Sequence, residues 1–65
     1  MKLAEKISNH PLVKELYQDC DGYWANLIDG YVHNGACAIR EDSLTRIWQA
    51  LRHSVMTREE YYKED

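Results

Sequence analysis

The clearest hydrophobic pattern in the chain lies between residues 42 and 55. Its apolar positions recur at spacings of three and four, which is the period of one face of an α-helix. They are Leu44, Ile47, Trp48, Leu51 and Val55. Asp42 or Ser43 can cap the start by accepting a backbone N–H, and the positive charge of Arg52 suits the last turn. The pattern predicts a central core helix.

The same period indicates two helices earlier in the chain. Over residues 12–20 the apolar positions are Leu12, Val13, Leu16 and Cys20, and Asp21-Gly22 is a typical helix end. Over residues 22–33 they are Trp24, Leu27, Ile28, Tyr31 and Val32. Both segments are therefore interpreted as helices.

Two shorter helices are predicted at the ends of the chain. Leu3 and Ile7 lie four apart, which suits a short helix over residues 2–8. Near the other end, Thr57 and Glu60 match a capping box, in which each side chain satisfies a backbone N–H of the other residue. We expect the last helix to begin at Arg58.

The segment from Tyr31 to Ile39 has an alternative interpretation. Gly30 is unfavourable inside a helix, and Asn34-Gly35 is the preferred sequence of a two-residue β-hairpin turn. A small hairpin near residues 31–39 therefore remains open beside the helical interpretation, with Ala36 to Glu41 otherwise a connector.

These elements predict an all-α fold, a compact bundle of four or five short helices forming one domain over residues 1–65. Its expected core is Leu16, Trp24, Leu27, Ile28, Ile47, Trp48 and Leu51.

Composition narrows the classes of function. The chain has 65 residues and a formal charge of −3, which argues against general affinity for nucleic acid or anionic membranes. No apolar run approaches the roughly 20 residues of a membrane span, and the polar start does not suit a secretory signal. Two cysteines are too few for a disulfide framework. We expect a cytoplasmic protein with reduced thiols.

Candidate chemistry is sparse. The conceivable soft-metal ligands are Cys20, His33, Cys37 and His53. They lack the paired spacing of a structural zinc site, because Asn34-Gly35 interrupts the one close pair. No nucleophile stands beside a base in the pattern, and no glycine-rich phosphate loop is present. We therefore expect neither a metal nor a cofactor, and we expect that the protein is not an enzyme.

The acidic residues and tyrosines offer a binding surface instead. Several acidic residues lie near predicted helix starts, where a negative charge is locally stabilising. If the fold gathers them, however, they would form an acidic face that binds a basic protein surface. The expected partner-binding residues are Asp19, Asp21, Tyr23, Asp29, Glu59, Glu60, Tyr62 and Glu64.

Two other functions remain open. The central helix carries Arg46, Gln49 and Arg52, residue types that contact bases and phosphates, so a small helix-turn-helix-like DNA-binding regulator is the first alternative. The nearby acids oppose phosphate binding. The second alternative is a structural or assembly subunit, since a chain this small often gains stability by self-association. The sequence does not indicate the oligomeric state.

In length, acidic charge and tyrosine content the chain resembles small phage-encoded anti-CRISPR proteins. The resemblance is limited to these general properties, because that group shares no sequence motif. It implies an inhibitor that occupies the nucleic-acid-binding surface of a host complex, in some members as a DNA mimic. It also implies a location in the bacterial cytosol and no direct contact with nucleic acid.

Overall fold

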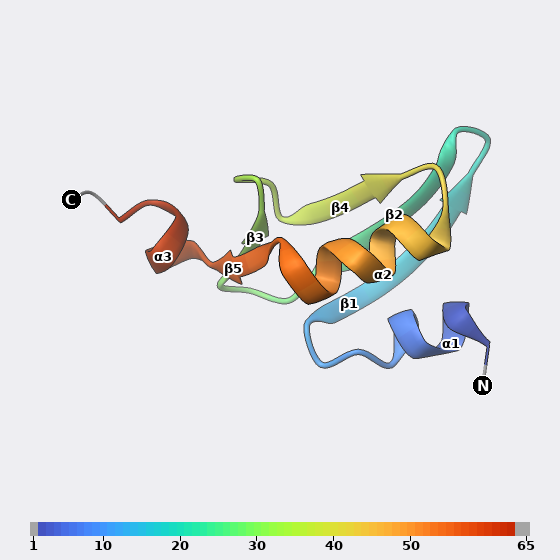
Figure 1. Cartoon of the computed structure of the whole chain (residues 1–65), viewed down its shortest axis with the longest axis horizontal. Coiled ribbons are helices and arrows are strands. Elements are labelled where there is room, and N and C mark those ends of the chain that lie inside the picture. The colour runs from blue at the N-terminus through green and yellow to red at the C-terminus, as the bar shows by residue number, and fades with distance from the viewer. Residues whose placement is uncertain (1, 64–65) are drawn as a thin grey trace.

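The computed structural model describes residues 2–63 and contains both helices and strands (Figure 1). In chain order they are α1 (Leu3–Ser8), β1 (Val13–Asp19), β2 (Gly22–Leu27), β3 (Tyr31–His33), β4 (Ala38–Glu41), α2 (Leu44–His53), β5 (Val55–Thr57) and α3 (Arg58–Tyr61). The strands form two antiparallel sheets, one with the order β1-β2-β4 and one that pairs β3 with β5. The fold is mixed α/β, so the prediction of an all-α bundle was wrong.

Three of the predicted helices form: α1, α2 and α3. Two of them have side-chain caps at their starts. Ser43 caps α2, its Oγ accepting the backbone N–H of Arg46 at 3.3 Å. Thr57 caps α3, its Oγ1 accepting the N–H of Glu60 at 3.2 Å. Local capping therefore sets these helix starts independently of the surrounding fold.

The predicted helix over residues 12–20 is the strand β1. Its pairing with β2 shifts between Val13 and Glu15, where a β-bulge interrupts the ladder. The bulge inserts one residue, so Val13 and Leu16 face the same side although they are three apart. A spacing of three, typical of a helix, is here produced by an irregular strand.

The predicted helix over residues 22–33 was also wrong. In β2 the residues Tyr23, Ala25 and Leu27 alternate with Trp24 and Asn26 and point toward the core. Trp24 therefore lies on the opposite face, and its predicted place in the core was wrong. Gly30 adopts a φ of +93°, which belongs to the turn that follows β2.

The Asn34-Gly35 turn forms, but a paired hairpin does not extend from it. Both residues have positive φ, as a type I′ turn requires, and His33 and Ala36 exchange backbone hydrogen bonds of 2.7 and 3.0 Å. Beyond this single bridge the strands separate, since β3 pairs with β5 while β4 pairs with β2.

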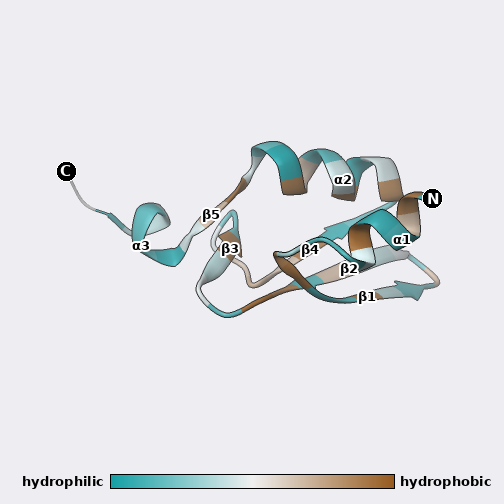
Figure 2. Cartoon of the chain, turned by 90° about the horizontal axis from the view of Figure 1, so that it is seen from below, coloured by the Kyte–Doolittle hydropathy of each residue, from teal (hydrophilic) through white to brown (hydrophobic). Residues whose placement is uncertain are grey.

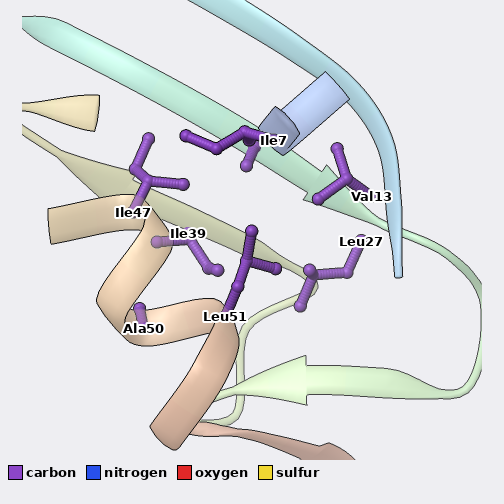
Figure 3. Close-up of a cluster of buried hydrophobic side chains, with 8 residues drawn as sticks. Ile7, Val13, Leu27, Ile39, Ile47, Ala50 and Leu51 are labelled. Atoms are coloured by element: carbon purple, nitrogen blue, oxygen red, sulfur yellow. The ribbon is translucent and has the colours of Figure 1, made fainter. Parts of the chain in front are cut away.

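The core lies between the three-stranded sheet and the two longer helices. Both α1 and α2 pack on one face of this sheet (Figure 2). Ile7, Ile39 and Ile47 are fully buried at the centre of the cluster (Figure 3). Of the predicted core, Leu27, Ile47 and Leu51 are buried, and Leu16 and Trp48 pack at its margin.

The β3–β5 ribbon and α3 extend from the end of the sheet opposite the β1–β2 turn (Figure 1). In the described part of the chain the longest helix, α2, has ten residues, and no helix there is long and apolar enough to cross a membrane.

Candidate functional site: the open face of the sheet

The face of the three-stranded sheet that points away from α1 and α2 is the candidate functional site (Figure 2). Residues alternate between the two faces of a strand, so the cross-strand register identifies this set. We call it the open face, and its members are Glu15, Tyr17, Asp19, Trp24, Asn26, Ala38 and Arg40.

Trp24 occupies the middle of the open face. It lies opposite Tyr17 of β1 and Arg40 of β4, so the three side chains form a row across the sheet. The Arg40 guanidinium carbon lies 4.6 Å from the centroid of the Trp24 ring, within the range of a cation–π interaction. Tyr17 is 47% exposed at the other end of the row, so aromatic surface is accessible there.

Asp19 fixes the orientation of the indole. Its Oδ2 accepts a hydrogen bond from Trp24 Nε1 at 2.6 Å, and its Oδ1 accepts the backbone N–H of Asp21 at 2.8 Å. The N–H of Asp21, followed by the indole N–H, holds the pKa of the Asp19 carboxyl below its ordinary value. The carboxylate is therefore ionised at neutral pH, and it ties the β1–β2 turn to the aromatic row.

Two further carboxylates border this row. Asp21 lies 3.6 Å from an Arg40 guanidinium nitrogen, in an exposed ion pair. Glu15 accepts a hydrogen bond from the Tyr17 hydroxyl, and this bond raises the pKa of Tyr17 above its ordinary value. Three carboxylates thus accompany one guanidinium, so the aromatic row is set in an acidic environment.

The predicted partner-binding residues do not form one surface. Asp19 belongs to the open face and Asp21 lies next to it in the β1–β2 turn, whereas Tyr23 points to the core side of the sheet. Asp29 is exposed between β2 and β3. The remaining described members lie on or just after α3, at the far end of the molecule: Glu59, Glu60 and Tyr62 (Figure 1). Glu64 lies outside the described residues.

Of the seven members of the open face, only Asp19 is among the predicted partner-binding residues. The other six are Glu15, Tyr17, Trp24, Asn26, Ala38 and Arg40. The alternation of Tyr23, Ala25 and Leu27 is the signal that identifies β2 as a strand and places Trp24 on the other face. Cys20-Asp21 forms the two-residue loop between paired Asp19 and Gly22, a hairpin connection that was interpreted as a helix end.

The residues of the DNA-binding alternative lie on α2, on the other side of the sheet. Arg46 lies 3.4 Å from Asp42 in an exposed ion pair, and Gln49 and Arg52 are exposed. A helix-turn-helix unit needs two helices joined by a short turn. Here β4 precedes α2 and β5 follows it.

The histidine and cysteine side chains were considered above as possible metal ligands. Among residues 2–63, no group of three histidine, cysteine or carboxylate side chains is placed to share a metal ion. Cys20 lies in the β1–β2 turn and Cys37 precedes β4, and both are exposed free thiols.

Comparisons with models of protein families, with curated proteins and with solved structures gave no significant match.

Proposed function

We propose that this protein is a protein-interaction module whose open face binds a basic segment of a partner protein. The observation that carries the proposal is the position of Trp24, held by Asp19 and Arg40 in the middle of an exposed sheet face. Tryptophan, tyrosine and arginine are the residue types that dominate binding energy at protein interfaces. All three stand in one row here.

The fixed geometry of this row favours association. A side chain that is already ordered loses little rotamer freedom on binding, whereas ordering a free one costs about 0.5–1.5 kcal/mol. Trp24 is held by a hydrogen bond at its edge and a guanidinium on its ring. The aromatic surface is thus ordered before a partner arrives.

The charge of the face favours a basic protein over nucleic acid. Aromatic side chains on a sheet can stack bases, but such platforms combine them with positive charge that tracks the phosphates. Here Glu15, Asp19 and Asp21 border the aromatic row. These carboxylates repel phosphates and attract lysine and arginine side chains.

We extend the proposal to the kind of partner. A basic protein surface that normally contacts nucleic acid would be complementary to the carboxylates at the β1–β2 turn, and occupying it would inhibit nucleic-acid binding. The acids of α3 form a separate group, so the proposed contact uses the open face alone.

The test compares two charge reversals of equal size at different places. Binding of a fluorescently labelled oligo-arginine peptide is measured by anisotropy for the unchanged protein, Asp21→Lys and Glu59→Lys. We expect Asp21→Lys to weaken binding about tenfold or more, equivalent to about 1.4 kcal/mol, and Glu59→Lys to have a much smaller effect. Both variants should keep the fold because both positions are exposed.

Equal weakening by the two reversals would mean that net charge alone drives binding, and it would contradict a site on the open face. A labelled single-stranded DNA oligonucleotide is the second probe. If it bound more tightly than the peptide at physiological salt, the face would be a nucleic-acid platform and the proposal would be wrong.

A further inference from the structure

The β3–β5 ribbon has a free edge on the β5 side. In the part of the chain that the structure describes, β5 pairs with β3 alone. The ribbon lies at the end of the molecule opposite the β1–β2 turn (Figure 1). A two-stranded sheet is only marginally stable by itself, so further pairing at this edge would stabilise it.

The backbone of β5 directs two of its three residues toward the free edge. His33 exchanges backbone hydrogen bonds of 2.7 and 3.0 Å with Ala36, so its N–H and C=O point away from β5. Val55 is the residue opposite His33, and two opposed residues of an antiparallel pair either bond to each other or both point away. Val55 therefore directs its N–H and C=O to the free edge. Thr57, two residues further along, does the same, while Met56 between them faces β3.

The strand β5 also lacks the charges that usually keep edge strands from pairing. Its sequence is Val55-Met56-Thr57, whereas β1 and β4, the edge strands of the larger sheet, both carry lysine or arginine and glutamate. Met56 is 38% exposed, and the exposed side chains of Tyr61 and Tyr62 follow it in α3 and at the end of this helix. An uncharged strand edge close to exposed apolar side chains is suited to pairing.

The charges that flank β5 favour a second copy of the chain as the occupant. Arg52 lies in the last turn of α2, before β5, and Glu59 and Glu60 lie in the first turn of α3, after it. All three side chains are exposed, and none of them forms a salt bridge within residues 2–63. Arg52 and Arg58 balance the two glutamates, so this stretch is locally neutral in a chain of charge −3. A basic end and an acidic end on one strand complement the same strand in the opposite direction.

We infer that this protein forms a symmetric dimer through β5. The β5 strands of two copies pair antiparallel about a two-fold axis at Met56, and the two ribbons become one four-stranded sheet. In this register Val55 of each copy exchanges hydrogen bonds with Thr57 of the other copy, which uses the outward groups of both residues. Arg52 of each copy comes beside Glu60 of the other, because both lie four residues from Met56. These residues all lie outside the open face.

The oligomeric state is measured by sedimentation equilibrium of the full chain at increasing concentration, up to about 1 mM. We expect a reversible equilibrium between monomer and dimer. Met56→Lys places two positive charges opposite each other at the two-fold axis and should weaken the dimer at least about tenfold. Met56→Thr is the matched control, which carries no charge, suits a strand and should retain the dimer. A monomer throughout the concentration range, or an undiminished Met56→Lys dimer, would overturn the inference.

Complementary variants test the charge contact. Arg52→Glu and Glu60→Arg each place like charges across the interface, so each variant alone should dimerise at least about tenfold more weakly. An equimolar mixture of the two variants restores opposite charges at both ends of the interface and should sediment as heterodimers. Lys14→Glu makes an equal change of charge on β1 and should leave the dimer intact, because Lys14 is exposed away from β5. A mixture that sediments like its separate components, or equal weakening by Lys14→Glu, would contradict this contact.

Amide hydrogen exchange locates the interface. Raising the protein concentration should protect the N–H groups of Val55 and Thr57, while the N–H of Met56, which faces β3, should change little. Circular dichroism checks that every variant is folded. Concentration-dependent protection elsewhere in the chain, with none at Val55 and Thr57, would place the contact on another surface and contradict pairing through β5.

Discussion

Trp24 and Asp19 are joined across the β1–β2 hairpin by a hydrogen bond of 2.6 Å from the indole Nε1 to Oδ2. The same carboxylate accepts the backbone N–H of Asp21, so one side chain orders both the turn and the aromatic row. Without these contacts the half-buried indole of Trp24 would sample more than one rotamer. The proposed binding function depends on this one contact more than on any other.

Removing the carboxylate should therefore release the indole. The Trp48→Phe variant retains Trp24 as its single tryptophan. In this variant we expect Asp19→Ala to lower the fluorescence anisotropy of Trp24. Oligo-arginine binding should weaken in parallel. The fold should persist, because exposed substitutions usually change stability by about 0.5 kcal/mol or less.

Asp19→Asn is the control for that experiment. It removes the charge but keeps an oxygen that can accept the indole N–H. If the Asp19→Ala protein kept the anisotropy of the Asp19→Asn protein, the hydrogen bond would not be what orders Trp24.

Acid should weaken the same contact over a defined range of pH. The pKa of Asp19 is lowered in the folded protein, mainly by the Asp21 N–H and then by Trp24. A lowered pKa means that the contact contributes stability above the ordinary aspartate value of about 3.9, and that this contribution is lost as the pH falls through the lowered value. Trp24 fluorescence of the Trp48→Phe protein should change with a midpoint below about 3.9.

Asp19→Asn should abolish this step, and circular dichroism should separate it from global acid unfolding. A midpoint above the ordinary aspartate value would show that Asp19 does not control the indole.

The core prediction concerns Ile47, which is fully buried between α2 and the sheet (Figure 3). Ile47→Ala should cost about 2–5 kcal/mol, because the change removes buried contacts and leaves a cavity. A domain of this size rarely has more than about 3–5 kcal/mol of stability, so the variant should be largely unfolded by circular dichroism. Thr45→Ala, on the exposed side of α2, should melt like the unchanged protein. If the Ile47→Ala protein remained folded by circular dichroism, Ile47 would not be at the centre of the core.

Of the three glycines, Gly22 is the one at which an added Cβ would lie closest to neighbouring backbone. A Cβ built there would lie 2.5 Å from the carbonyl oxygen of Glu41, whereas a Cβ at Gly30 meets nothing within 4 Å. Both glycines have positive φ, so alanine at either position should cost about 1–2 kcal/mol of backbone strain. Gly22→Ala should cost about 1–3 kcal/mol more, the usual effect of overpacking, as measured by urea unfolding. Equal losses at both positions would contradict this close approach.

The sequence predicted the parts of the fold that local interactions determine. Ser43 and Thr57 cap their helices through contacts within one turn, and the stripe of α2 reads directly as a buried face. The two capping contacts join residues three apart in the chain, so the sequence shows both partners directly.

The strands could not be derived in the same way, because pairing partners decide them. The bulge after Val13 gives β1 an apolar spacing of three, which is typical of a helix. Only the pairing with β2 shows that the segment is a strand. The open face was missed for the same reason: Tyr17, Trp24 and Arg40 come together only through the register of three strands. Among the predicted binding residues, only Asp19 belongs to this face, and Asp21 lies next to it in the β1–β2 turn.

The most direct test of the account maps a basic probe onto the protein. Nitrogen–proton correlation spectra are recorded while an oligo-arginine peptide is added at low and at physiological salt. We predict saturable shifts of the Trp24 indole N–H and of amides in β1, β2 and β4, with weaker binding at higher salt because exposed charges are screened. Shifts centred on Glu59 and Glu60 of α3 with an unchanged indole signal would contradict the claim that the open face binds basic partners.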